Sequence, residues 1–199
     1  MTALATRPKI LFIGPLSDFS GYAAVARGYV EALVGAGAEV ATRDLIYDGG
    51  KRKKSVEERI LARRSAQDVD IVFQHTTPNE MTPKPGCFNV GAFCWETDRL
   101  PQLWVDHLNK MDLVLVPCES NLKVARRCGV LVPVEKVHYA FDTTAYQQRP
   151  EPYSISGKDN AFKLLAICQY SKKKGIDPLL KAYLSEFRPE DNTLLILKT

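Results

Sequence analysis

Carboxylates and a histidine follow two apolar runs of this 199-residue chain, at positions where they could move protons or bind hydroxyl groups. His75 closes the run "DIVFQH", whereas Glu96 and Asp98 follow the run "GAFC", with Trp95 beside them. A carboxylate next to an aromatic ring suits hydrogen bonding to sugar hydroxyls, or general-base catalysis. His75 is a candidate proton carrier because imidazole titrates near neutral pH, although a single histidine is more often structural.

The segment from Trp95 to Asp98 has two interpretations. It can bind a ligand through Trp95, Glu96, Thr97 and Asp98. Alternatively, Asp98 caps a helix that starts near Pro101, because proline is favoured in the first turn of a helix. We favour the capping role for Asp98, whereas Glu96 has no comparable structural explanation.

A loop bounded by two glycines, "GPLSDFSGY", separates an apolar run from a helical pattern. Helix N-termini carry unpaired N–H groups and a positive dipole end, so Gly14, Ser20, Gly21 and Tyr22 are candidate ligand-binding residues. The spacing of the glycines does not match the dinucleotide-binding pattern GxGxxG. The alternative is a wide turn in which Ser20 caps the helix, and the sequence leaves both interpretations open.

A second candidate binding loop is "CQYSKKKG", which lies between a predicted strand and a predicted helix. Lys173 and Lys174 could neutralise a diphosphate there, helped by the N-terminus of the helix. The alternative is an ordinary solvated loop, and position alone favours the phosphate interpretation only slightly.

Strand and helix patterns alternate along the chain, which is typical of a parallel sheet with helices on both faces. The predicted strands cover residues 9–13, 39–45, 70–74, 87–94, 112–116 and 134–139. Predicted helices follow Gly21, Ser55, Pro101 and Ser120, and Ser55 with Glu58 forms a capping-box pattern.

The composition changes over residues 147–160, "QQRPEPYSISGKDN", which we interpret as a linker. The alternation then restarts with a strand at 162–168, a helix at 176–187 and a strand at 193–197. The chain therefore divides into a domain at 1–146, the linker at 147–160, and the start of a second, incomplete domain at 161–199.

Composition narrows the classes of function. The net charge is +4, and basic and aromatic residues do not interleave as they do in grooves for single-stranded nucleic acid, so we expect no nucleic-acid partner. The five cysteines have no CxxC spacing and predict free thiols rather than disulfides or a metal site. The sequence shows no signal peptide and no apolar run long enough to span a membrane, so we expect a cytoplasmic protein. Its excess of basic residues leaves open the alternative that one face contacts a membrane surface.

Six segments, in this order, resemble the glycosyltransferases of the GT-B fold, and within them the large retaining group called family 4, which includes bacterial mannosyl- and glucosyltransferases. The segments are "FIGPLSDFSGYAAVARGYVEAL", "DIVFQHTTP", "GAFCWETDRLPQLW", "MDLVLVPCESNLKVARRCGV", "VEKVHYAFD" and "AICQYSKKKGIDPLLKAY". The resemblance covers nearly the whole chain. The ordered set is more specific than any single segment.

The resemblance implies two Rossmann-like domains that face a cleft. The first would hold a sugar, lipid or protein acceptor, with residues 14–21 lining the cleft, and His75 and residues 95–98 on the acceptor side. The second would bind a nucleotide-diphosphate sugar as co-substrate, with Lys173 and Lys174 at the diphosphate. The hexose would transfer with retention, without a metal or another cofactor, through an oxocarbenium-like transition state.

Two other functions remain open. The chain could be a non-catalytic binding or assembly protein that pairs its second half with a partner chain or with another copy of itself. It could also be another kind of Rossmann-type nucleotide binder, although the absence of the GxGxxG pattern argues against this.

Overall fold

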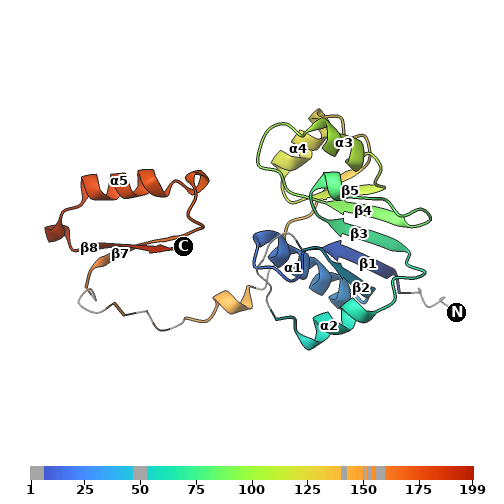
Figure 1. Cartoon of the computed structure of the whole chain (residues 1–199), viewed down its shortest axis with the longest axis horizontal. Coiled ribbons are helices and arrows are strands. Elements are labelled where there is room, and N and C mark those ends of the chain that lie inside the picture. Colours follow the sequence, from blue (N-terminus) through green and yellow to red (C-terminus); the bar gives the residue numbers. More distant parts are fainter. Residues whose placement is uncertain (1–6, 47–52, 140–142, 150, 152–153, 156–159) are drawn as a thin grey trace. The chain divides into compact units, whose positions relative to one another are not determined.

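The computed structural model describes residues 7–46, 53–139, 143–149, 151, 154–155 and 160–199. The chain divides into two compact units, Met1–Thr143 and Thr144–Thr199 (Figure 1). Of the predicted linker, residues 150, 152–153 and 156–159 lie outside the described ranges.

The first unit is an α/β unit built on a six-stranded sheet with the order β2-β1-β3-β4-β5-β6, in which all neighbours run parallel. The elements are β1 (Lys9–Gly14), α1 (Gly21–Gly35), β2 (Glu39–Asp44), α2 (Val56–Arg63), β3 (Ile71–His75), the short 3₁₀ helix η1 (Pro78–Glu80), β4 (Phe88–Ala92), α3 (Gln102–Leu108), β5 (Leu113–Val116), α4 (Glu119–Arg127) and β6 (Val134–Lys136). The order and the flanking helices are compatible with a Rossmann-like fold.

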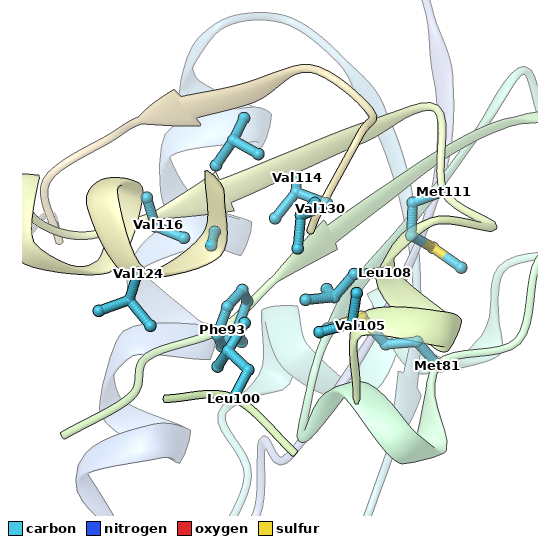
Figure 2. Packing of buried hydrophobic residues seen from close by; sticks show 12 residues of the cluster. Met81, Phe93, Leu100, Val105, Leu108, Met111, Val114, Val116, Val124 and Val130 are labelled. Carbon is cyan, nitrogen blue, oxygen red and sulfur yellow. The ribbon is translucent and has the colours of Figure 1, made fainter. Parts of the chain in front are cut away.

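Both faces of the inner strands β1, β3, β4 and β5 are largely buried, and these strands are rich in apolar residues. On one face, Phe12 and Phe73 pack with Tyr29 and Val30 of α1. On the other face, side chains of β5 pack against α3 and α4 (Figure 2). This second cluster consists of Met81, Phe93, Leu100, Val105, Leu108, Met111, Val114, Val116, Val124, Ala125, Val130 and Val134.

The predicted starts of α1 and α2 are confirmed. Ser55 and Glu58 form the predicted capping box, in which the Glu58 backbone N–H donates to Ser55 Oγ at 3.2 Å. Ser20 is the N-cap of α1. After α4 the chain reverses at Gly129, which has a φ of 95° that favours glycine.

Two predicted strands are three residues longer than the observed ones. Residues 87–94 were expected to form a strand, but β4 ends at Ala92, and the Cys94 backbone N–H donates to the Tyr22 hydroxyl instead of to a strand. Residues 134–139 were also expected to be a strand, but β6 ends at Lys136 because its partner β5 ends at Val116.

The second unit has a two-stranded parallel sheet of β7 (Phe162–Ile167) and β8 (Thr193–Lys198), joined through α5 (Ile176–Glu186). Its 3₁₀ helices are η2 (Thr144–Tyr146), η3 (Lys172–Lys174) and η4 (Pro189–Asp191). Leu164, Leu195 and Tyr183 line one hollow between the sheet and α5. Among the described residues of the chain, no helix has the length and apolar character needed to cross a membrane.

Gly14 is required by packing at the end of β1. A Cβ on this residue would lie 3.0 Å from the His75 backbone oxygen and 3.0 Å from the Phe12 ring. Gly14→Ala should therefore destabilise the first unit by about 1–3 kcal/mol, because a backbone oxygen cannot move aside as a side chain can. Urea unfolding followed by tryptophan fluorescence measures this, since Trp95 and Trp104 both lie in the first unit.

Gly21→Ala is the matched control. A Cβ there would meet nothing within 4 Å, and alanine is the better helix former, so stability should stay unchanged or rise slightly. Equal midpoints for wild type and Gly14→Ala would contradict the packing role of Gly14.

Candidate functional site

The candidate site lies where the strand order of the first sheet changes direction. β1 is flanked by β2 on one side and by β3 on the other, so the connections after β1 and β3 leave toward opposite sides. Open parallel sheets bind ligands in the crevice at such a point, outside the carboxyl ends of the strands. Gly14 ends β1 and His75 ends β3, so two of the predicted residues flank this point.

The loop at 15–20 is fixed to the end of β2 by a half-buried carboxylate. Asp44 accepts hydrogen bonds from the backbone N–H groups of Leu16 and Ser17 at 2.8 and 3.2 Å, and one from the Ser17 hydroxyl. Lys54 forms an ion pair with Asp44 at 2.8 Å. Burial alone would raise the pKa of Asp44, but these donors together outweigh it and lower that pKa.

The same loop is joined to α1. The Ser20 hydroxyl donates to Asp18 Oδ1 at 2.5 Å and accepts from the Ala23 backbone N–H at 3.1 Å. Arg27 donates to the backbone oxygens of Leu16 and Asp18 at 3.1 and 3.3 Å. The capping interpretation of Ser20 is therefore confirmed, and its hydroxyl is engaged within the loop.

Tyr22 joins the start of α1 to the segment after β4. Its hydroxyl accepts from the Cys94 backbone N–H at 3.2 Å and lies 3.4 Å from the Cys94 backbone oxygen, to which it donates. Burial raises the pKa of Tyr22, and the nearby charge of Glu96 adds to the rise. Two predicted binding residues from distant parts of the sequence, Tyr22 and Glu96, are thus brought together.

Asn121 holds the next residue in the same way. Its side-chain oxygen accepts from the Trp95 backbone N–H at 3.2 Å, and its amide donates to the Trp95 backbone oxygen at 2.6 Å. Asn121 is buried at 3% exposure. The sequence analysis missed this residue, since an asparagine within a helical pattern gives no signal that it reaches another loop.

The capping role predicted for Asp98 is wrong. α3 begins at Gln102 with Pro101 as its N-cap, and no side chain caps it. Asp98 instead lies 3.9 Å from Arg127 of α4 at the surface, because the segment after β4 turns toward α4. Thr97 donates to the Arg99 backbone oxygen at 3.1 Å.

A surface hollow of about 380 Å³ lies between this segment and α4. It is lined by Glu96, Thr97, Asp98, Ser120, Lys123, Val124 and Arg127. Hydroxyl, carboxylate and cationic groups together suit a ligand with many hydroxyls, since each group can donate to or accept from one. The exposed carboxylate of Glu96 is the candidate base among them.

His75 does not reach the surface. It is 0% exposed and lies between Tyr22, stacked at 4.7 Å, and Tyr29, edge-on at 5.5 Å. Its Nδ1 is 3.2 Å from the Ala92 backbone oxygen, and among the described residues Nε2 has no hydrogen-bond partner. Burial lowers the pKa of His75 to about 4, although the backbones of Ala92 and Tyr22 offset part of the effect.

The tyrosines around His75 remain protonated near neutral pH. Burial raises the pKa of Tyr29 to about 12. Burial also raises the pKa of Tyr139, and the nearby Cys94 thiol adds to that rise. All five cysteines are half-buried free thiols. In the described part of the chain, no three histidine, cysteine or acidic side chains are grouped so that they could hold a metal ion.

In the second unit, Lys173 and Lys174 lie in η3, directly after β7 and before α5. Both are exposed. Gly175 follows them with a φ of 66°, which allows the chain to turn into α5. The lysines therefore stand beside a helix N-terminus at the carboxyl end of a parallel strand, as the sequence predicts.

Comparison with known proteins returns no relative: no family model, no curated protein and no solved structure matches this chain.

The buried imidazole predicts a loss of stability in acid. The pKa of His75 in the folded chain is about 4, below the unfolded value of 6.5, so the unfolded chain binds more protons between these values. Stability present above pH 6.5 is then lost as the pH falls toward 4, by an amount on the order of 3 kcal/mol. Urea unfolding at several pH values should show a shallower pH dependence for His75→Gln than for wild type. Parallel curves would show that His75 is not buried as the neutral form.

Removal of the Asn121 side chain should release Trp95. Asn121→Ala leaves the backbone N–H and oxygen of Trp95 without their partners, at an expected cost of about 1–3 kcal/mol. Trp95 and Trp104 are the two tryptophans of the chain, and their ring centroids lie 4.5 Å apart. Near-UV circular dichroism should therefore change when the two rings separate.

Asn109 offers a matched control, because it also joins two backbone groups, the Gly129 oxygen at 3.0 Å and the Leu131 N–H at 2.7 Å. Asn109→Ala should lose stability without the change in the tryptophan spectrum. If the Asn121→Ala spectrum matched the wild type, Asn121 would not be holding Trp95.

Proposed function

We propose that this chain supplies the acceptor-side domain and the start of the donor-side domain of a retaining GT-B glycosyltransferase similar to family 4. The observation that carries the proposal is the meeting of three segments at one sheet edge. Gly14, His75 and Cys94 end or follow β1, β3 and β4, and Tyr22 contacts both His75 and Cys94. Loops at this edge are where a parallel sheet of this order binds its ligand.

The proposed reaction transfers a hexose from a nucleotide-diphosphate sugar to a hydroxyl of a sugar, lipid or protein acceptor. The bond between C1 of the hexose and the diphosphate oxygen breaks, and a bond from the acceptor oxygen to C1 forms on the same face. The acceptor proton passes to the departing phosphate. Glu96 accepts a hydrogen bond from the acceptor, and Thr97 and Asp98 bind further hydroxyls. These roles are supported by the position of all three residues on the lining of the hollow.

Lys173 and Lys174 stabilise the departing diphosphate in this proposal. Positive charge placed where negative charge develops is the main way in which a protein lowers such a barrier. The exposed position of both lysines, beside the N-terminus of α5, supports this role. His75 acts indirectly, because it is buried and supports Tyr22 by stacking.

A non-catalytic binding or assembly protein is the second candidate. Two observations favour it: the histidine that could move protons is buried in its neutral form, and an apolar face of β7 is exposed. On that face Leu165 and Ile167 are 62% and 66% exposed, as a surface that pairs with a partner chain would be.

Transfer assays decide between these functions. The complete gene product that carries this sequence is incubated with a panel of nucleotide-diphosphate hexoses and sugar acceptors, and nucleotide release and the anomeric configuration of the product are measured. We expect transfer with retention. Glu96→Gln should lower kcat/KM for the acceptor by roughly tenfold, because it weakens one charged hydrogen bond. Lys173→Ala with Lys174→Ala should lower kcat/KM by about 10²-fold.

Two exposed residues serve as matched controls: Asp106→Asn on α3 and Lys181→Ala on α5 should leave the rate unchanged. A product of inverted configuration, or the absence of nucleotide release with every donor, would contradict the proposal. In the latter case a stoichiometric complex in solution would support the binding protein.

A further inference from the structure

Within the loop at 15–20, residues 17–19 reverse the usual distribution of polar and apolar side chains, whereas Leu16 is buried as expected. Ser17 and Asp18 are buried at 5% and 7% exposure, whereas Phe19, the one aromatic residue of the loop, is 74% exposed. Burying a phenylalanine is worth roughly 1.5–3 kcal/mol, so folding alone would favour the opposite arrangement. A single exposed apolar side chain is common on protein surfaces, so the case for Phe19 rests on how its loop is held.

The exposure of Phe19 does not come from a loosely held loop. The residues before it are bound to Asp44, and the backbone oxygens of Leu16 and Asp18 accept from Arg27. The residue after it, Ser20, is bound to Asp18 through both its N–H, at 2.8 Å, and its hydroxyl. Both neighbours of Phe19 are thus fixed, so the backbone that carries the ring loses little conformational entropy when a ligand binds.

The surface beside Phe19 is open and carries small uncharged residues. Ser20, Gly21 and Ala24 are the exposed residues that follow it, and the space next to Gly21 is empty to 4 Å. Two charged residues lie in the loop and the first turns of α1. Asp18 is buried, and Arg27 donates hydrogen bonds to the Leu16 and Asp18 backbone oxygens. The exposed residues that follow Phe19 are therefore small and uncharged, which suits a neutral ligand with an apolar face.

We propose that Phe19 is a stacking platform for the pyranose ring of a neutral sugar, an inference that rests on the proposed function for its choice of carbohydrate. One face of a pyranose carries C–H groups, which pack on the electron-rich face of an aromatic ring, while its rim carries hydroxyls. In this proposal the groups that bind the sugar hydroxyls come from the segment at 95–98, which contains Glu96. Tyr22, three residues after Phe19, holds this segment near the loop through its bonds to the Cys94 backbone.

Saturation-transfer NMR on the 199-residue chain tests this, with methyl α-D-glucopyranoside and methyl α-D-mannopyranoside as probes. We expect saturation to reach the ring C–H protons of at least one probe. Phe19→Ala should weaken binding roughly three- to tenfold, the loss of one aromatic contact, whereas Phe19→Trp should retain it. Phe162→Ala is the matched control, since Phe162 is 68% exposed but lies in the second unit, and it should bind as the wild type does.

Several outcomes would overturn the proposal. The first is that the wild type binds neither probe at about 50 mM, a concentration that would detect even weak affinity. The second is that wild type and Phe19→Ala bind equally well. A third is Phe19-dependent binding to phosphatidylcholine–phosphatidylglycerol vesicles without sugar binding, which would mark Phe19 as a membrane contact. The test is separate from catalysis: sugar binding through Phe19 in a protein without transfer activity supports the platform and contradicts the glycosyltransferase.

Discussion

The Tyr22 side chain is the contact on which the arrangement of the candidate site depends. Its ring stacks on His75 at the end of β3, and its hydroxyl binds the backbone of Cys94 after β4. Tyr22 itself lies in the first turn of α1, directly after the loop that follows β1. One side chain therefore ties together three segments that are far apart in the sequence. Parallel strands bring these segments to one edge, and Tyr22 fixes their positions there.

Buried and half-buried polar side chains supply the rest of the order at this edge. Asp44 binds the loop after β1, and Asn121 binds the backbone of Trp95. A buried polar group that lost its partner would be costly, so each of these bonds restricts its loop to one conformation. His75 is the exception, since its Nε2 has no partner among the described residues and its pKa is low as a result of burial. Of the loop at 15–20 and the segment at 95–98, the side chains of Phe19, Glu96, Thr97 and Asp98 are exposed and could meet a ligand.

The two units differ in how complete their packing is. In the first, helices cover both faces of a six-stranded sheet, and Phe12, Leu108, Val114 and Val116 are fully buried. In the second, one helix packs on a two-stranded sheet, and Leu165 and Ile167 remain exposed. A sheet in the interior of an α/β protein needs cover on both faces. The second unit thus presents a surface that further protein could cover.

The sequence by itself determined the elements and their order. Apolar runs predicted the eight strands to within a few residues, and the capping pair Ser55 and Glu58 marked the start of α2, because these signals act over a few neighbouring residues. Only the tertiary structure decided which side chains reach the site. The Asp98 prediction failed because α3 starts four residues later, at Gln102, and Asp98 lies near Arg127 of α4 instead. Asn121 and Asp44 gave no signal, and His75 looked accessible, because burial and long-range hydrogen bonds depend on which segments the sheet brings together.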